Sequence, residues 1–144
     1  MVTGTVFSGR VQVGDEVRIE PSGRKARVRS LHAQNRPADV GHAGERCALN
    51  LAGVARDEVA RGDWIAAADF GAVSDRVDVE LTVARGEPHA IGAWTPVHAH
   101  LGAAHLTARV VPLDREAIAA GATGLAQLVL SSPTLVVQGD LLVL

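Results

Sequence analysis

Residues 11–28 read VQVGDEVRIEPSGRKARV, and this stretch decides the fold class. Apolar and polar side chains alternate along residues 11–13 and again along residues 17–19, which is the pattern of half-buried β-strands. Proline, serine and glycine at residues 21–23 supply turn chemistry, and the alternation resumes at Ala26. The stretch is therefore predicted to form a β-hairpin.

The same alternation continues along most of the chain. A Gly-Asp pair followed by apolar residues begins at Gly14, Gly62 and Gly139. Each pair is predicted to form a turn before a strand, because glycine permits a positive φ and aspartate can bond the local backbone. Residues 114–121 are expected to form a short helical turn. Further strands are predicted at residues 2–6, 26–28, 46–51, 76–83, 97–101, 106–111, 125–130, 135–137 and 141–144.

The spacing of these short strands predicts an all-β fold of two consecutive small β-barrels. We place the first barrel at residues 1–69 and the second at residues 70–144, because the segment 66–74 separates two sets of strands. The last predicted strand ends without a turn or a polar tail. The second barrel is therefore expected to be truncated at its C-terminal strand.

The composition bounds the class of protein. Hydrophobic residues make up 47% of the chain, which is enough to bury a core. No apolar run approaches the roughly 18–20 residues that span a bilayer, and the N-terminus lacks a signal-peptide pattern, so no membrane partner is expected. The single cysteine, Cys47, fits a reducing cytoplasm. It alternates with Leu49 and Leu51 and is predicted to be a core residue, whereas Arg46, Ala48 and Asn50 are predicted to point to the opposite face.

Positive charge gathers in the first half of the chain. Residues 1–69 hold 10 Lys+Arg against 9 Asp+Glu, and residues 70–144 hold 4 against 7. Such a cluster could contact phosphates, although the charge pattern alone favours a solvated hairpin face. The basic residues of the predicted hairpin are Arg24, Lys25, Arg27 and Arg29.

The chain carries no recognisable catalytic set. A G-x-x-x-x-G-K-[ST] motif is absent, so this chain is predicted neither to bind nor to hydrolyse GTP by itself. His98 and His100 share one face of a predicted strand, and His105 follows the next turn. A His-x-His pair on a barrel strand can ligate a metal, as in cupins. A small metal-binding barrel enzyme therefore stays an alternative. The preferred interpretation is that these histidines are polar surface residues or contact RNA, and that the chain binds no metal.

Several stretches resemble a known family. Residues 3–15 are similar to the start of the second domain of translational GTPases in their TGTV, Gly9 and VGD segments. The runs VRSLHAQNRP at residues 28–37 and AGERCALNLAG at residues 43–53 resemble selenocysteine-specific elongation factors. So do RGDW at residues 61–64, WTPVH at 94–98 and GAAHLT at 102–107. The resemblance covers nearly the whole chain.

This resemblance implies both a fold and a function. The two barrels would be domains 2 and 3 of a translational GTPase, which delivers selenocysteyl-tRNA to the ribosome as a GTP complex. GTP and Mg²⁺ would bind the factor's own GTPase domain, and an mRNA hairpin would bind C-terminal domains, both outside this chain. Another translational GTPase, with a general aminoacyl-tRNA or initiator role, would share both barrels and remains an alternative.

The resemblance also implies site residues. Arg46 stands at the arginine of the family's Gly-x-Arg-x-Ala-Leu-Asn run and would contribute to the selenocysteine pocket. His32 and His42 lie near the same strand ends and would orient the amino acid or the terminal adenosine. An Asp-Arg pair that the family's pocket also uses would lie upstream of residue 1. The residues expected to face RNA or the ribosome are Arg24, Lys25, Arg27, Arg29, Arg36, His98, His100 and His105.

Overall fold

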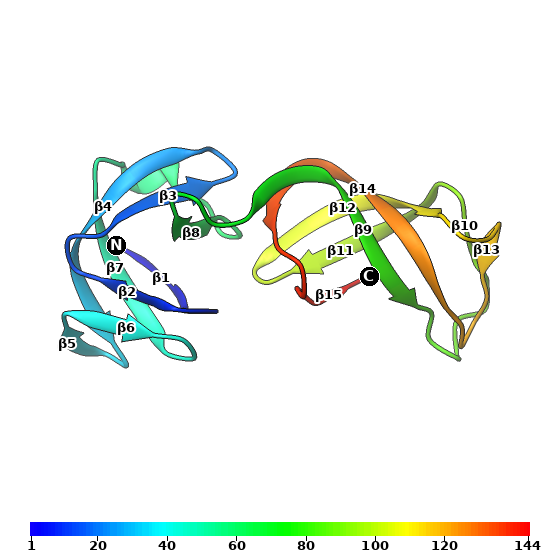
Figure 1. Ribbon diagram of the computed structural model, residues 1–144, viewed down its shortest axis with the longest axis horizontal. Helices are drawn as coiled ribbons and strands as arrows, with labels where there is room; N and C mark the ends of the chain where they lie inside the picture. The colour runs from blue at the N-terminus through cyan, green and yellow to red at the C-terminus, as the bar shows by residue number, and fades with distance from the viewer. The chain divides into compact units, whose positions relative to one another are not determined.

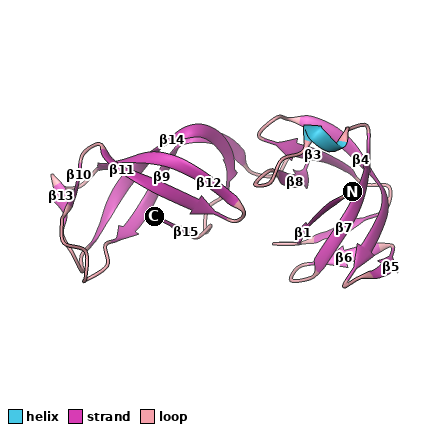
Figure 2. Ribbon diagram, turned by 180° about the vertical axis from the view of Figure 1, so that it is seen from behind, coloured by secondary structure: helices cyan, strands magenta, loops and turns pink.

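A computed structural model describes all residues of the chain, Met1–Leu144, and confirms the predicted all-β fold (Figure 1). Figure 2 shows the one helical element, the 3-10 turn η1 at Arg56–Glu58. No helix has the length and apolar character needed to cross a membrane. The chain divides into two compact units, Met1–Phe70 and Gly71–Leu144, each with a hydrophobic core of its own.

The first unit is built on one antiparallel sheet whose strand order is β1-β7-β4-β3-β8. Its inward side chains, such as Ile19 and Val28, are almost wholly buried. A short strand, β5, pairs with the end of β4, and β2 pairs with β6 beside this sheet. The strands are β1 Val2–Thr5, β2 Arg10–Gln12, β3 Glu16–Glu20, β4 Arg24–Ala33, β5 Arg36–Ala38, β6 Val40–His42, β7 Arg46–Ala52 and β8 Trp64–Ala67.

The second unit repeats this construction with a sheet of order β15-β11-β12-β14-β9. Its core is centred on Val110, Ile118 and Leu128, which are fully buried. A two-stranded ladder of β10 and β13 lies beside the sheet. The strands are β9 Ala72–Thr82, β10 Ile91–Gly92, β11 Thr95–Leu101, β12 Ala104–Pro112, β13 Ala117–Ile118, β14 Thr123–Val136 and β15 Leu142–Val143.

The three Gly-Asp turns share one design. Each glycine has a φ between 95° and 100°, a region that favours glycine. The Oδ2 atoms of Asp15, Asp63 and Asp140 each accept a hydrogen bond from the backbone amide three residues earlier, at 2.8–3.0 Å. The side chain thus closes the turn that precedes the next strand, as predicted.

Two local expectations were wrong. Residues 114–121 form no helical turn, because Ile118 enters the core and pairs with Ile91 in a strand ladder. The predicted strands 125–130 and 135–137 form one strand, β14, which pairs with β9 on both sides of an irregularity between Val129 and Thr134. Pro133 lies within that irregular segment, where a residue without an amide hydrogen cannot continue a ladder.

Candidate aminoacyl and RNA interface

Arg46 opens β7 on the outer face of the first sheet. Side chains alternate along this strand, so Cys47, Leu49 and Leu51 enter the core and Arg46 faces outward. Arg46 lies opposite Thr5 of β1. Its guanidinium is exposed and forms no ion pair, which leaves its charge uncompensated. The strand therefore presents one free cation at the sheet surface.

The neighbours of Arg46 on this face are neutral. His32 of β4 lies opposite Ala48, and Thr3 of β1 lies opposite Ala48 from the other side. His32 is thus a diagonal neighbour of Arg46, a relation that places the two residues about 7–8 Å apart, within reach of long side chains. Asn50, opposite Ser30, continues the same face. Sequence reasoning did not select Thr3 or Ser30, because the cross-strand register that brings them to this face is invisible in the sequence.

His42 lies elsewhere, at the end of β6. It pairs with Arg10 of β2, and its Nδ1 atom lies 3.6 Å from the carboxylate of Glu45. Glu45 also accepts a hydrogen bond from the His42 amide at 2.7 Å. The structure thus brings His32, but not His42, onto the outer face that carries Arg46.

The buried side of β7 is fitted closely around Cys47. A Cβ atom on Gly41 would lie 2.5 Å from the Cys47 sulfur, so this position of β6 has no room for a side chain. Burial, and to a smaller extent the Glu45 carboxylate, raises the pKa of the Cys47 thiol. The cysteine is therefore a packing residue on the buried face of β7, the same strand that carries Arg46 on its outer face.

The predicted basic hairpin does not present one uniform cationic face. Arg24 forms an ion pair with Glu58 of η1, and Arg27 pairs with Glu16 across the hairpin at 2.9 Å. Their charges are partly neutralised. Lys25, Arg29 and Arg36 are exposed and form no ion pair, so these three are free to contact an anion. Arg29 is the residue at which the register of β4 and β7 shifts.

Three of the four histidines of the second unit, His98, His100 and His105, form one exposed cluster on the β11–β12 hairpin. His98 Nδ1 and His105 Nε2 lie 3.1 Å apart, within hydrogen-bond distance. His100 stacks on His105, with ring centroids 4.5 Å apart and planes at 2°. No group of three or more histidine, cysteine or acidic residues in the chain is arranged to hold a metal ion. The cluster is therefore a polar surface that can both donate and accept hydrogen bonds.

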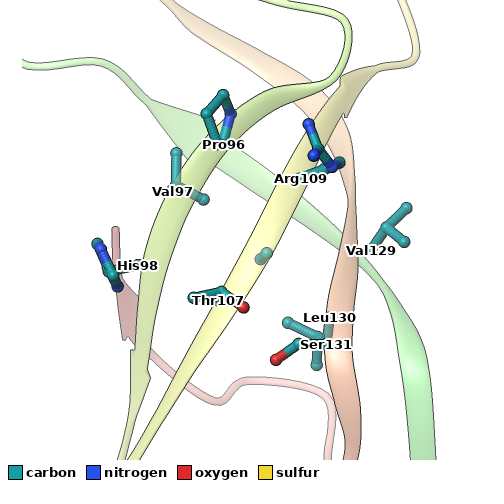
Figure 3. A pocket seen from close by; sticks show the side chains of 9 residues that line it. Pro96, Val97, His98, Thr107, Arg109, Val129, Leu130 and Ser131 are labelled. Atoms are coloured by element: carbon teal, nitrogen blue, oxygen red, sulfur yellow. The ribbon is translucent and has the colours of Figure 1, made fainter.

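An open groove of about 450 Å³ continues from this cluster across the sheet (Figure 3). Thr107 lies opposite His98, and Arg109 lies opposite Pro96 one row further on. Arg109 donates a hydrogen bond to the Trp94 carbonyl at 3.2 Å and forms no ion pair. Sequence reasoning missed Arg109. The groove is lined by Pro96, Val97, His98, Thr107, Ala108, Arg109, Val129, Leu130 and Ser131.

Two family models match the chain in succession. Residues 1–66 match "Elongation factor Tu domain 2", and residues 74–144 match "Selenocysteine-specific elongation factor, beta-barrel domain". The selenocysteine-specific elongation factor of Escherichia coli (strain K12) is 40% identical over the whole chain. The chain spans only 22% of that relative's length.

Solved structures agree with these matches. The apo translation elongation factor SelB from Methanococcus maripaludis superposes with a TM-score of 0.83 over 98% of this chain and 34% of its own, at 22% identity, which shows the fold. A bacterial selenocysteine-specific elongation factor, EF-Sec, superposes with a TM-score of 0.78 over 97% of this chain and 22% of its own, at 27% identity. The chain belongs to the selenocysteine-specific elongation factor family and corresponds to its two β-barrel domains.

Proposed function

We propose that these two barrels bind selenocysteyl-tRNA for delivery to the ribosome, with the Arg46 face receiving the amino acid. The observation that carries this proposal is the uncompensated guanidinium of Arg46 among neutral side chains. An exposed cation surrounded by hydroxyl, amide and imidazole groups suits one small anionic group.

Selectivity follows from the ionisation of the amino acid. A selenol is much more acidic than a hydroxyl, so selenocysteine is largely anionic at neutral pH and serine is neutral. The Arg46 guanidinium would stabilise the selenolate and contribute little to serine. His32, the diagonal neighbour on the same face, would contact the amino acid or the terminal adenosine. His42 would act only on a ligand large enough to reach β6.

RNA contacts would come from cations in both barrels. Lys25, Arg29 and Arg36 of the first unit carry free charges. Arg24 and Arg27 would have to exchange their carboxylate partners for phosphates, and we assign them a weaker part. In the second unit the contacts would come from His98, His100 and His105, together with Arg109, because this face offers a continuous row of donors.

GTP and Mg²⁺ would bind a GTPase domain outside these residues. This chain has no strand–loop–helix element that could cradle phosphates, since its only helical element is the three-residue η1. The barrels would therefore contribute tRNA recognition and catalyse no step themselves. The ribosome and the GTPase domain would be the further partners of the complete factor.

The test compares two aminoacyl-tRNAs in an intact selenocysteine-specific factor that carries these barrels. Arg46→Ala should weaken selenocysteyl-tRNA by about 10- to 100-fold, the size of a charge-assisted hydrogen bond of roughly 1.5–3 kcal/mol. Seryl-tRNA should change much less. Arg36→Ala is the matched control and should weaken both tRNAs equally. Equal loss of both tRNAs in Arg46→Ala would refute the selective role.

A further inference from the structure

The outer face of the second sheet changes character along its strands. Cross-strand pairing puts His98 with Thr107, and Arg109 with Val129 and Arg76, in successive rows. Beyond Arg109 the rows contain no basic residue. Val111 lies beside Gln127 and Asp78, and Leu125 lies opposite Glu80. The polar, cationic half of the face thus gives way to an apolar and acidic half.

Two leucines dominate this second half. Leu113 donates its amide to the Leu125 carbonyl at 2.9 Å, so the two are direct cross-strand neighbours. Their exposed fractions are 53% and 51%. Two adjacent leucines that are more than half exposed bury little of their apolar surface within this chain.

Trp94 lies at the same end of the sheet and is 58% exposed. Its φ of 65° lies in the left-handed region, which is unusual for a bulky residue. Hydrogen bonds hold this backbone in place, from the Trp94 amide to the Val110 carbonyl at 2.7 Å and from Arg109 to the Trp94 carbonyl. A strained backbone that is fixed on both sides, and that carries an exposed indole, indicates a recognition residue rather than a packing residue.

The charges bordering this surface select the kind of partner. Asp78 is hydrogen-bonded to the neutral Gln127 amide at 2.9 Å, and neither Asp78 nor Glu80 forms an ion pair. Asp114 and Arg115 neutralise each other at 2.8 Å. Arg109 adds one unpaired positive charge beside Trp94. Asp78 and Glu80 still leave the border net negative, which disfavours a phosphate backbone and favours a basic partner.

From these observations we propose that Trp94, Val111, Leu113 and Leu125 form a docking surface for a basic amphipathic protein segment. Apolar side chains of the partner would cover the two leucines and the indole. Lysine or arginine side chains next to them would pair with Asp78 and Glu80. This surface adjoins the RNA contacts proposed above at Arg109, which donates a hydrogen bond to the Trp94 carbonyl.

The test uses the whole chain and a fluorescently labelled synthetic helical peptide of leucine and lysine, with leucine along one face. Fluorescence anisotropy should show the peptide binding at least about tenfold more tightly than a matched leucine–glutamate peptide. The double variant Leu113→Ser/Leu125→Ser should weaken binding by about tenfold or more. Asp78→Asn/Glu80→Gln, which leaves the apolar surface intact, should weaken binding and reduce its salt dependence.

Val143→Ser is the matched control, because Val143 is 69% exposed at the opposite, histidine end of the same sheet. It should leave peptide affinity unchanged. Equal affinity for both peptides, or an unchanged affinity in both double variants, would overturn the proposal. So would sedimentation showing that the surface pairs two copies of the chain, or competition by an RNA duplex that is lost in Leu113→Ser/Leu125→Ser.

Discussion

The two barrels present positive charge in different ways. In the first, Arg46 lies among neutral side chains on the outer face of β7, next to Cys47, which packs tightly on the buried face of the same strand. In the second, Arg109 and His98 line one groove, and His105 and His100 adjoin His98. A single fixed guanidinium distinguishes one anionic group from a neutral one, whereas a row of donors follows an extended polyanion without distinguishing its parts. Under the proposed function, the first barrel would select the amino acid through Arg46, and cations of both barrels would contribute affinity for the RNA.

Two independent binding faces require that each barrel be stable by itself. The first core is centred on Ile19 and Val28, and the second on Val110, Ile118 and Leu128. No residue belongs to both clusters. Each recognition face therefore rests on its own core, and damage to one core should spare the other face.

The largest expected effect comes from Leu128→Ala, which tests whether the two units unfold independently. Leu128 is fully buried on β14, and its truncation should lower the unfolding free energy of the second unit by about 2–5 kcal/mol. Each unit has one tryptophan, Trp64 in the first and Trp94 in the second. In urea unfolding, tryptophan fluorescence therefore reports the first unit in a Trp94→Phe background and the second unit in a Trp64→Phe background. A parallel shift in the first unit would show that the barrels unfold as one.

The second prediction concerns the packing beneath Arg46. Gly41→Ala should cost about 1–3 kcal/mol of stability in the first unit, because the new methyl would lie 2.5 Å from the Cys47 sulfur. Adding Cys47→Ala should recover part of that loss, so a double-mutant cycle measures the coupling. Gly4→Ala is the control, since nothing lies within 4 Å of its new methyl. Additive costs in the cycle would contradict the close fit.

Sequence patterning predicted the fold better than the site, and particular residues show why. Period-two alternation along residues 46–51 placed Cys47 inside and Arg46 outside, because strand faces are a local property. The neighbours of Arg46 depend on register across β1, β7 and β4, which connects residues far apart in the chain. His32 shares the Arg46 face and His42 does not, although both precede β7 closely in sequence.

The same limit explains the errors in the second barrel. Residues 114–121 are small and polar enough to suggest a helical turn, but the burial of Ile118 and its pairing with β10 determine the structure. Arg109 is one arginine within an alternating strand and gives no local signal. Its groove appears only when β11, β12 and β14 lie side by side.

A smaller effect is expected from Arg109→Ala, which sharpens the contrast with Arg46. Loss of one phosphate contact should weaken selenocysteyl-tRNA and seryl-tRNA by the same factor, and should reduce the slope of log affinity against log salt by about 1. The measurement is a salt titration of tRNA binding to the intact factor. A selective loss of selenocysteyl-tRNA would mean that the second barrel also reads the amino acid.

The smallest effect is expected at the exposed Asp114–Arg115 pair, in which the Arg115 guanidinium already forms an ion pair. Two hydrogen bonds from Arg115, at 2.8 and 3.0 Å, are the main reason that the pKa of the Asp114 carboxyl lies below its usual value of 3.8. A lowered pKa in the folded state means that the pair stabilises the fold above pH 3.8 and that this contribution disappears as the pH falls through the folded pKa. Both groups are exposed, so the contribution should be small.

Arg115→Ala should therefore raise the Asp114 pKa toward 3.8 in an NMR titration, with Arg85→Ala as the control. An unchanged pKa in Arg115→Ala would assign the shift to the Leu125 amide instead.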